Sequence, residues 1–148
     1  MATINIQLDK AIGTIKPMHG GGQAPIIPDA KDTHFHYLTE AGIPYSRLSD
    51  VGGAFGRGVY VDITNIFRNF DADVNDPNSY DFVFTDLLIN QLIKAGVEPY
   101  YRLWNTMESS CDVKYYNLDP PKDFEKWACI CEHIMAHYLE GWADGFHY

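Results

Sequence analysis

The chain has 148 residues, of which 46% are hydrophobic and 14% aromatic, enough apolar material for one globular domain with a buried core. Its formal net charge is −9, and only 11 Lys and Arg residues are spread along it. Because nucleic acids are bound through clustered basic side chains, this charge argues against a nucleic-acid partner.

The amino-terminal residues, MATINIQLDK, lack the cationic start and continuous apolar stretch of a secretory signal, and no run of eighteen apolar residues occurs. Three cysteines form no even set for a disulfide framework, and Cys129 and Cys131 diverge on a predicted helix. We therefore expect a soluble protein without a membrane partner, in the reducing cytoplasm.

The first quarter of the chain contains one predicted strand–loop–helix unit. Residues 3–8 carry β-branched side chains at alternate positions, which predicts a lid strand or hairpin. Residues 15–18 form a short apolar strand that runs into the turn HGGGQAP. Asp32 is placed to cap a helix through THFHYLTEAG, and Gly42 is its predicted end.

Two further strand–helix units follow. Residues 43–48 are the second predicted strand, and a long loop separates them from a helix over residues 80–95. Residues 97–104 are the third strand, followed by a second long loop and a helix over residues 123–139 with Asp123 as its cap.

Strands that alternate with helices predict an α/β fold with a parallel sheet and right-handed crossovers. The turns from helix to strand are short (AGIP and AGVEP), whereas the loops that leave the strands are long and rich in Gly, aromatic, acidic and Arg residues. Ligands bind at the carboxyl ends of the strands in a β/α barrel and in a doubly wound sheet alike. This difference in loop length therefore predicts that the functional face is at the carboxyl ends of the strands. It does not distinguish a β/α barrel from a doubly wound sheet.

Two glycine-rich segments, HGGGQAP and GGAFGRG, match neither GxGxxG nor a P-loop. The second lies inside a long loop with no helix directly after it, so the helix N-terminus that would hold a phosphate is missing. We interpret both as flexible loops and expect no cofactor.

Several histidines raise the possibility of a metal site. His34 and His36 are two residues apart, and Cys131, His133 and His137 lie on one predicted helix, with the two histidines at a spacing that can share a metal. The segment HIMAH lacks the Glu of HExxH, however, and no tetrahedral set of ligands is evident. We expect packing and surface roles, and no metal.

Five features occur in a recognisable order: an Arg-x-x-Asp that closes the second strand, YDF at the entry to the second helix, an AG-x-x-P step into the third strand, a Glu soon after it, and a Trp in the third helix. They lie in the segments IKPMHG, LTEAGIPYSRLSD, YDFVFTDLLINQLIKAGVEPYYRLWNTMES and FEKWACICEHIMAHYLEG. In this order they resemble the amino-terminal part of a clan A glycoside hydrolase, closest to the family 39 β-xylosidase and iduronidase type.

The resemblance covers nearly the whole chain and implies a single domain, residues 1–148, formed by about three βα units of a partial (β/α)8 TIM barrel. Retaining enzymes of this kind use two carboxylates about 5–5.5 Å apart. In the resembled family these lie at the ends of strands four and seven, and strand four is expected just after residue 148. The resemblance thus implies an amino-terminal fragment that binds an oligosaccharide or glycoside, lacks the catalytic Glu pair and is inactive alone.

The resemblance also indicates sugar-binding residues. His19 is expected at the end of strand one. Arg47 and Asp50 close strand two, where Arg47 is expected to orient a catalytic Glu and Asp50 to bind sugar hydroxyls, unless the two form a plain ion pair. Ser49 stands where the family commonly has His, so we expect the sugar contacts here to differ from those of the family.

The remaining predicted sugar contacts are Tyr101 and Trp104, towards the end of the third predicted strand, and Glu108, shortly after it. Aromatic rings stack on the apolar faces of pyranoses, which makes Trp104 the best candidate for a sugar platform, with core packing as the alternative. Glu108 either binds sugar or caps the loop. Arg102 stands where relatives usually carry an acidic residue, so we do not assign the substrate specificity of those relatives to this chain.

A sheet that ends after three units exposes one face and one strand edge, which favours self-association or pairing with the missing carboxyl-terminal part of the barrel. Two other interpretations stay open. One is a free-standing sugar-binding or assembly module of flavodoxin-like shape. The other is a different α/β enzyme that uses Asp50 and Glu108 as its acid and base.

Overall fold

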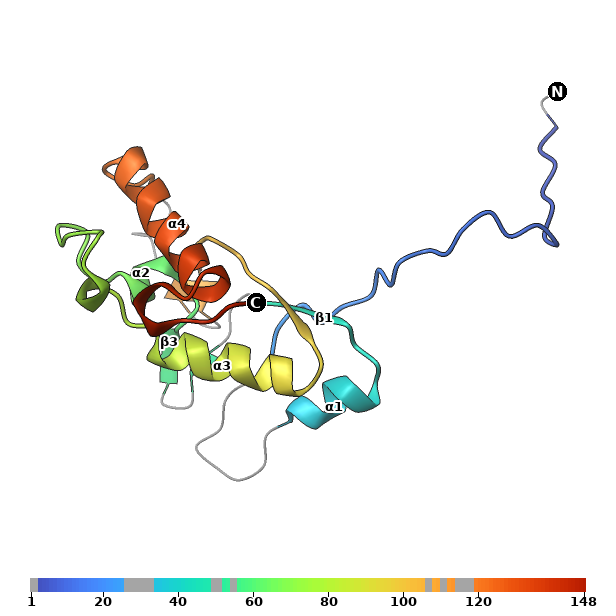
Figure 1. The fold of residues 1–148 in the computed structure, drawn as a ribbon, viewed down its shortest axis with the longest axis horizontal. Helices are drawn as coiled ribbons and strands as arrows, with labels where there is room; N and C mark the ends of the chain where they lie inside the picture. Colours follow the sequence, from blue (N-terminus) through green and yellow to red (C-terminus); the bar gives the residue numbers. More distant parts are fainter. Residues whose placement is uncertain are drawn as a thin grey trace.

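The computed structural model describes residues 3–25, 34–48, 52–53, 56–105, 108–109, 112–113 and 119–148. At its centre is a parallel pair of short strands, β1 (Tyr45–Arg47) and β4 (Glu98–Tyr100). Three longer helices complete the framework, α1 (Phe35–Glu40), α3 (Val83–Lys94) and α4 (Phe124–Leu139), and α3 contacts β4 (Figure 1). The order of strands and helices confirms the predicted α/β fold with a parallel sheet.

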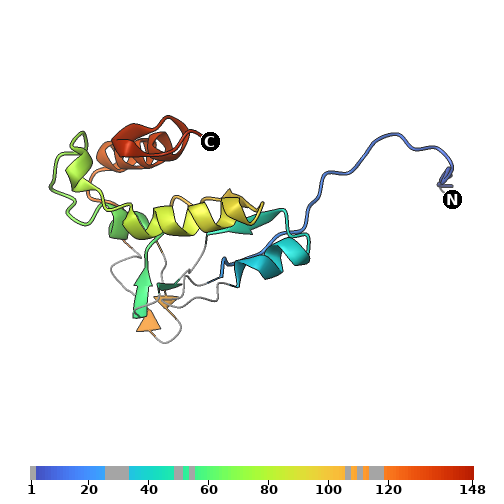
Figure 2. The same cartoon turned by 60° about the horizontal axis from the view of Figure 1, so that its bottom comes forward.

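The amino-terminal residues extend away from the rest of the protein (Figures 1 and 2). Residues 3–8 form no strand, so the predicted lid strand or hairpin is wrong for the structure described. The side chains of Ile4, Ile6 and Leu8 are 85%, 76% and 94% exposed. An alternating pattern needs a sheet or core to pack against, and this segment contacts neither.

The first strand is also shifted from its predicted position. Residues 15–18 have no regular structure, and the chain instead makes a single parallel bridge between Gly21 and Ser46. Gly21 N donates to Tyr45 O at 2.8 Å, and Arg47 N donates to Gly21 O at 2.8 Å. A Cβ atom on the neighbouring Gly20 would lie 3.0 Å from Tyr45 O, so glycine permits this close approach of the two backbones.

The register of β1 and β4 gives the sheet two different faces. The Cα partners are Tyr45 and Glu98, Ser46 and Pro99, and Arg47 and Tyr100. Ser46 is fully buried, as is Leu48 two residues later, whereas Arg47 is exposed. Because side chains alternate along a strand, Ser46 and Leu48 face the helices on what we call the outer face. Arg47 and Tyr100 lie on the opposite, inner face.

The helix ends follow the predicted signals. α1 and α3 are followed by Gly42 and Gly96, which have φ angles of +63° and +72°, a left-handed conformation that favours glycine. The Asp123 side chain caps α4 by accepting a hydrogen bond from Lys126 N at 3.0 Å. The predicted cap Asp32 lies outside the described residues.

The two long loops contain small elements of their own. β2 (Gly52–Gly53) pairs antiparallel with β3 (Gly56–Val59), and β5 (Glu108–Ser109) pairs antiparallel with β6 (Asp112–Val113). The interpretation of GGAFGRG as a flexible loop is therefore wrong for the glycines that pair in β2 and β3. The first loop also contains a short helix, α2 (Ile63–Ile66), and a 3-10 turn, η1 (Pro77–Ser79).

One apolar core joins these elements. Its fully buried side chains come from the end of β1, from the segment around α2, and from the inward stripes of α3 and α4: Leu48, Val61, Ile63, Ile66, Leu88, Ile89, Leu92, Ile130 and Ile134. After α4 the chain turns back through η3 (Trp142–Asp144) along the end of that helix. Within the described ranges no helix combines the length and apolar character needed to cross a bilayer.

Candidate functional site

The carboxyl ends of β1 and β4 bring two large polar side chains to the inner face. Arg47 and Tyr100 are register partners on adjacent parallel strands, so their side chains emerge side by side. Arg47 is exposed, and Tyr100 is 65% exposed. A guanidinium beside a phenol can donate hydrogen bonds to a carboxylate or to sugar hydroxyls and offers an aromatic face for stacking.

Trp104 follows β4 at the same end of the sheet, with a fixed backbone and a solvent-accessible ring. Its carbonyl accepts a 3.3 Å hydrogen bond from Ile63 N, and its own N–H donates to Arg102 O at 2.9 Å. The residue is nevertheless 54% exposed. Its large apolar surface is therefore open to a ligand and is not used for core packing.

The segment around α2 is attached to the same end of β4. Asn105 Oδ1 accepts hydrogen bonds from both Thr64 N and Thr64 Oγ1, each at 3.2 Å. Together with the bond between Ile63 and Trp104, these contacts hold α2 against the carboxyl end of the strand. The long first loop thus lies against the carboxyl end of β4.

Arg102 forms an ion pair with this loop. Its Nη2 atom lies 3.9 Å from Oδ1 of Asp62, and the Asp62 side chain is 2% exposed against 28% for Arg102. A buried carboxylate requires a cationic or hydrogen-bonding partner, which Arg102 supplies. Arg102 is therefore paired with the carboxylate of Asp62, the residue that directly precedes α2.

Tyr101 occupies a different place from the one expected. Its Oη atom donates to Val61 O at 3.1 Å, and its ring lies 5.7 Å from that of Tyr138 on α4. Burial, and next the Asp62 carboxylate, raise the pKa of Tyr101 well above its ordinary value. Strand alternation turns Tyr101 to the outer face and leaves Tyr100 on the inner face, which corrects the expected position. Its contact with a sugar stays an untested prediction.

His19 is also displaced from its expected position. It precedes the bridge at Gly21, and its Nε2 atom lies 3.0 Å from the carbonyl oxygen of Gly42, in the turn that leads into β1. Since the bridge is parallel, this is the amino end of the strands, opposite the carboxyl end where the site was expected. The placement at the carboxyl end of strand one is therefore corrected, because the first strand begins later than its apolar residues indicate.

Two other predicted contacts lie beyond what the structure describes. Asp50 falls outside the described residues, as does Ser49. Glu108 begins β5, but its side chain lies outside the described part of the structure. The proposed pairing of Arg47 with Asp50 and the alternative acid–base pair of Asp50 and Glu108 therefore stay predictions.

Sequence reasoning missed two residues of this face. Tyr100 could have been found by applying strand alternation to VEPYYRLW, since it shares the face of Arg102 and not that of Tyr101. Asp62 gave no such signal, because it lies in a long loop and becomes important only when α2 folds against β4.

A separate groove of about 630 Å³ lies on the outer face, between α3, β4 and α4. Its lining is largely apolar and includes Ile89, Ile93, Tyr101, Met135, Leu139 and Tyr148. Because the helices form its walls, it is distinct from the face that carries Arg47 and Tyr100.

The histidines considered as metal ligands have other partners. His137 is buried, with one ring nitrogen 2.8 Å from Trp142 O and the other 3.0 Å from Asp86 Oδ1. His133 Nδ1 lies 3.4 Å from the Tyr80 hydroxyl. No group of three or more His, Cys, Asp or Glu side chains suited to a metal occurs among the residues that the structure describes.

A parallel strand pair with helices, and with long loops at its carboxyl ends, places this chain among the α/β proteins. Comparisons with known proteins are more specific. The model of the glycosyl hydrolases family 39 matches residues 20–144. The chain therefore belongs to glycosyl hydrolase family 39.

Two relatives show the extent of the likeness. A β-xylosidase of Geobacillus stearothermophilus is 23% identical over 91 residues, which cover 57% of this chain and 18% of that protein. A crystal structure of a glucosidase from Croceicoccus marinus superposes with a TM-score of 0.68 at 24% identity, over 93% of this chain and 27% of that one. The chain thus spans about a quarter or less of each, and the structural likeness concerns the fold alone.

Proposed function

We propose that this chain is the amino-terminal portion of a (β/α)8 barrel in a glycoside hydrolase and that it supplies part of the sugar-binding surface. Membership of family 39 supports the reaction class, hydrolysis of an O-glycosidic bond. The barrel is supported by the fold shared with the glucosidase and by strands whose outer face is covered by helices.

The observation that carries this proposal is the grouping of Arg47, Tyr100 and Trp104 at the carboxyl ends of neighbouring parallel strands. The two aromatic side chains are 65% and 54% exposed, although aromatic residues are usually among the more buried types. An open aromatic surface beside a guanidinium is suited to a pyranose ring, whose faces are apolar and whose rim carries hydroxyls.

We further propose that the retaining carboxylate pair lies outside this chain, so that the chain binds sugar without cleaving it. Asp50 and Glu108 are proposed as additional sugar contacts. Arg47 is suited to hold one carboxylate of the catalytic pair, because its planar fork donates two parallel hydrogen bonds to such a group.

Hydrolysis of a panel of aryl glycosides tests the location of the catalytic pair. The purified chain is assayed beside the same chain extended through the strands that follow it in its parent gene. If only the extended protein cleaves the glycosides, the proposal is supported. If the 148-residue chain cleaves them without the extension, the proposal is refuted, and Asp50 and Glu108 become the residues to mutate.

Titration of the chain with xylo- and gluco-oligosaccharides tests the surface itself. Trp104→Ala is expected to weaken binding about tenfold, since it removes a stacking platform. Phe124→Ala is the control, because Phe124 is another exposed ring, 69% exposed against 54% for Trp104, and lies at the start of α4. Equal affinities of the wild type and Trp104→Ala would contradict the proposed surface.

The alternative of a free-standing, flavodoxin-like sugar-binding module gives a different outcome in the same assays. Such a module binds the oligosaccharides at full affinity by itself, and extension of the chain changes neither affinity nor activity. A barrel portion gains affinity when the remaining strands complete the cleft.

We also propose self-association of the isolated chain through its inner face, where Tyr100 is open to solvent. Sedimentation velocity at increasing concentration tests this, with Tyr100→Lys expected to favour the monomer. A monomer at all concentrations would refute it. A reducing compartment, the cytoplasm, is proposed from the free thiols of Cys129 and Cys131.

A further inference from the structure

The amino-terminal arm, which we define as residues 3–18, extends from the protein with its apolar side chains in solvent (Figures 1 and 2). Ile4, Ile6 and Leu8 are 85%, 76% and 94% exposed. In an extended chain alternate side chains share a face, so these three lie on one side of the arm and the polar residues between them lie on the other. Such an apolar face is stabilised when another apolar surface covers it.

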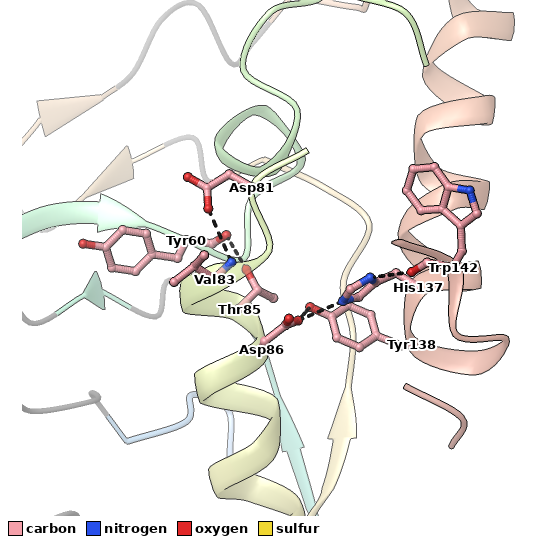
Figure 3. A network of polar contacts seen from close by, with 8 residues as sticks. All are labelled: Tyr60, Asp81, Val83, Thr85, Asp86, His137, Tyr138 and Trp142. Carbon is pink, nitrogen blue, oxygen red and sulfur yellow. Dashed lines mark hydrogen bonds and ion pairs between the residues drawn. The ribbon is translucent and has the colours of Figure 1, made fainter. Parts of the chain in front are cut away.

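The groove on the outer face is a second apolar surface that is open to solvent. Its lining residues Ile93, Leu139 and Tyr148 are 36%, 48% and 51% exposed. In the wall formed by α4, the Tyr138 hydroxyl donates to Oδ1 of Asp86 on α3 at 3.0 Å, which joins the two helices (Figure 3). The walls are therefore held in place before anything binds, and this lowers the entropic cost of binding.

The groove lies beside a strand edge that has no partner. β4 pairs with β1 along one edge, and no described strand pairs with the other edge. Glu98 N donates to Pro44 O at 2.9 Å, and Tyr100 O accepts from Leu48 N at 3.0 Å. These bonds turn the backbone of Glu98 and Tyr100 towards β1 and that of Pro99, between them, towards the free edge. Pro99 lines the groove, so its carbonyl oxygen can accept a hydrogen bond from a strand added there.

The arm and the groove also differ in charge. The arm carries the cations Lys10 and Lys16 and one anion, Asp9, whereas the whole chain has a net charge of −9. Glu98 is the charged residue among the described residues that line the groove. The arm of one copy is therefore attracted to the anionic remainder of another.

We propose that the arm of one copy adds to the free edge of β4 in a second copy and places Ile4, Ile6 and Leu8 in its groove. In its own copy the arm leaves the sheet at the bridge between Gly21 and β1, on the side of β1 away from β4. Each copy has one arm and one such groove, so a reciprocal exchange fills both and closes a twofold dimer. Further strands in a longer parent chain would compete for this edge, so the tests use the 148-residue chain.

Sedimentation velocity at increasing concentration tests the arm. Ile6→Asp combined with Leu8→Asp is expected to raise the dissociation constant of the dimer at least about tenfold, because it places charges on the apolar face. Asn5→Asp combined with Gln7→Asp is the matched control. It adds the same charge to the opposite face and should change the constant by less than about threefold.

Two results of this experiment would overturn the proposal. One is a wild type that is monomeric at every concentration, and the other is an equal effect of the two double substitutions. Association that Tyr100→Lys weakens and the Ile6→Asp and Leu8→Asp pair leaves unchanged belongs to the inner face. That result would refute the arm exchange while leaving the inner-face association standing.

A pair of single substitutions tests the groove. Leu139→Gln is expected to raise the dissociation constant about threefold to tenfold, because Leu139 lines the groove and is exposed enough to be replaced without loss of the core. Val83→Gln is the control, since Val83 is 62% exposed on α3 and does not line the groove. Equal dissociation constants in the two variants would contradict the docking site.

Photo-crosslinking distinguishes binding between copies from binding within one copy. A photoreactive amino acid replaces Ile6, and isotopically heavy and unlabelled chains are mixed before irradiation. Cross-linked peptides of mixed isotopic composition that join this position to the peptide of Met135 and Leu139 are expected. Peptides of a single composition would show that the arm binds in its own copy, and cross-links to the surface around Tyr100 would place it on the inner face. Either result would overturn the proposal.

Discussion

Arg102 Nη2 lies 3.9 Å from Oδ1 of Asp62, a residue that is only 1% exposed and precedes α2. A second ion pair, between Arg68 Nη2 and Asp81 Oδ2, is shorter at 2.7 Å, but its side chains are 62% and 35% exposed. We expect the buried Arg102–Asp62 pair to affect the free energy of unfolding more than the shorter Arg68–Asp81 pair, because water screens the charges of an exposed pair.

Arg102→Met is therefore expected to lower the free energy of unfolding by about 2 kcal/mol, since it leaves the Asp62 carboxylate buried without its cation. Arg68→Met, the matched control, should change it by less than about 1 kcal/mol. Urea denaturation of both variants measures the difference. An equal effect of the two substitutions would contradict the role assigned to burial.

The buried Tyr138 side chain is expected to make the free energy of unfolding decrease at alkaline pH. Its pKa is raised above the ordinary 10.0 by burial and, next, by Tyr101 and Asp86. The unfolded chain therefore loses this proton first, so the contribution to stability is complete below about pH 10 and decreases as the pH rises from there. For this buried group the loss is up to about 1.4 kcal/mol per pH unit.

Denaturation between about pH 9 and pH 11 tests this dependence. Tyr138→Phe should be less stable than the wild type at neutral pH, because the hydrogen bond to Asp86 is lost, and should show a shallower decline above about pH 10. Tyr37→Phe is the control, since Tyr37 is 57% exposed on α1. An unchanged slope in Tyr138→Phe would show that this tyrosine does not cause the decline.

Gly145 lies where the carboxyl-terminal segment, residues 141–148, passes close to α4, and its lack of a side chain allows this approach. A Cβ atom at this position would overlap the carbonyl oxygen of His137 and lie 2.6 Å from its Nδ1 atom. Gly145→Ala is therefore expected to cost about 1–3 kcal/mol or to detach the segment. At Gly22 a Cβ atom would meet nothing within 4 Å, so Gly22→Ala should be neutral to within about 0.5 kcal/mol.

Thermal unfolding measures the loss of stability in Gly145→Ala. Fluorescence of Trp142, in a chain whose other tryptophans Trp104 and Trp127 are changed to Phe, measures the displacement of the segment. Similar behaviour of Gly145→Ala and Gly22→Ala would show that the close approach to His137 is not a constraint on the folded chain.

Cys131 is expected to react slowly with thiol reagents. The residue is half-buried, and burial raises the pKa of its thiol, so the reactive thiolate is less populated at a given pH. Iodoacetamide labelling followed by peptide mass spectrometry should give a lower rate at Cys131 in the folded chain than in urea. Equal rates in the two conditions would contradict the protection expected from burial.

Local signals in the sequence determined much of the framework. The glycines after α1 and α3, the Asp123 cap of α4 and the apolar spacing of the last two helices act within a few residues, so their structures follow from short-range sterics and hydrogen bonding. The order of five motifs was also enough to indicate family 39, which the family comparison confirmed.

The tertiary structure alone decided where the side chains of the site lie. The register of β1 and β4 placed Tyr100 beside Arg47 and turned Tyr101 to the helices, and the bridge at Gly21 put His19 at the amino end. A shift of one residue in a strand moves every side chain to the other face, and sequence composition does not specify that shift. The pairs Asp62–Arg102 and Asp86–His137 join segments 40 and 51 residues apart, so only the packing of the folded chain could bring them together.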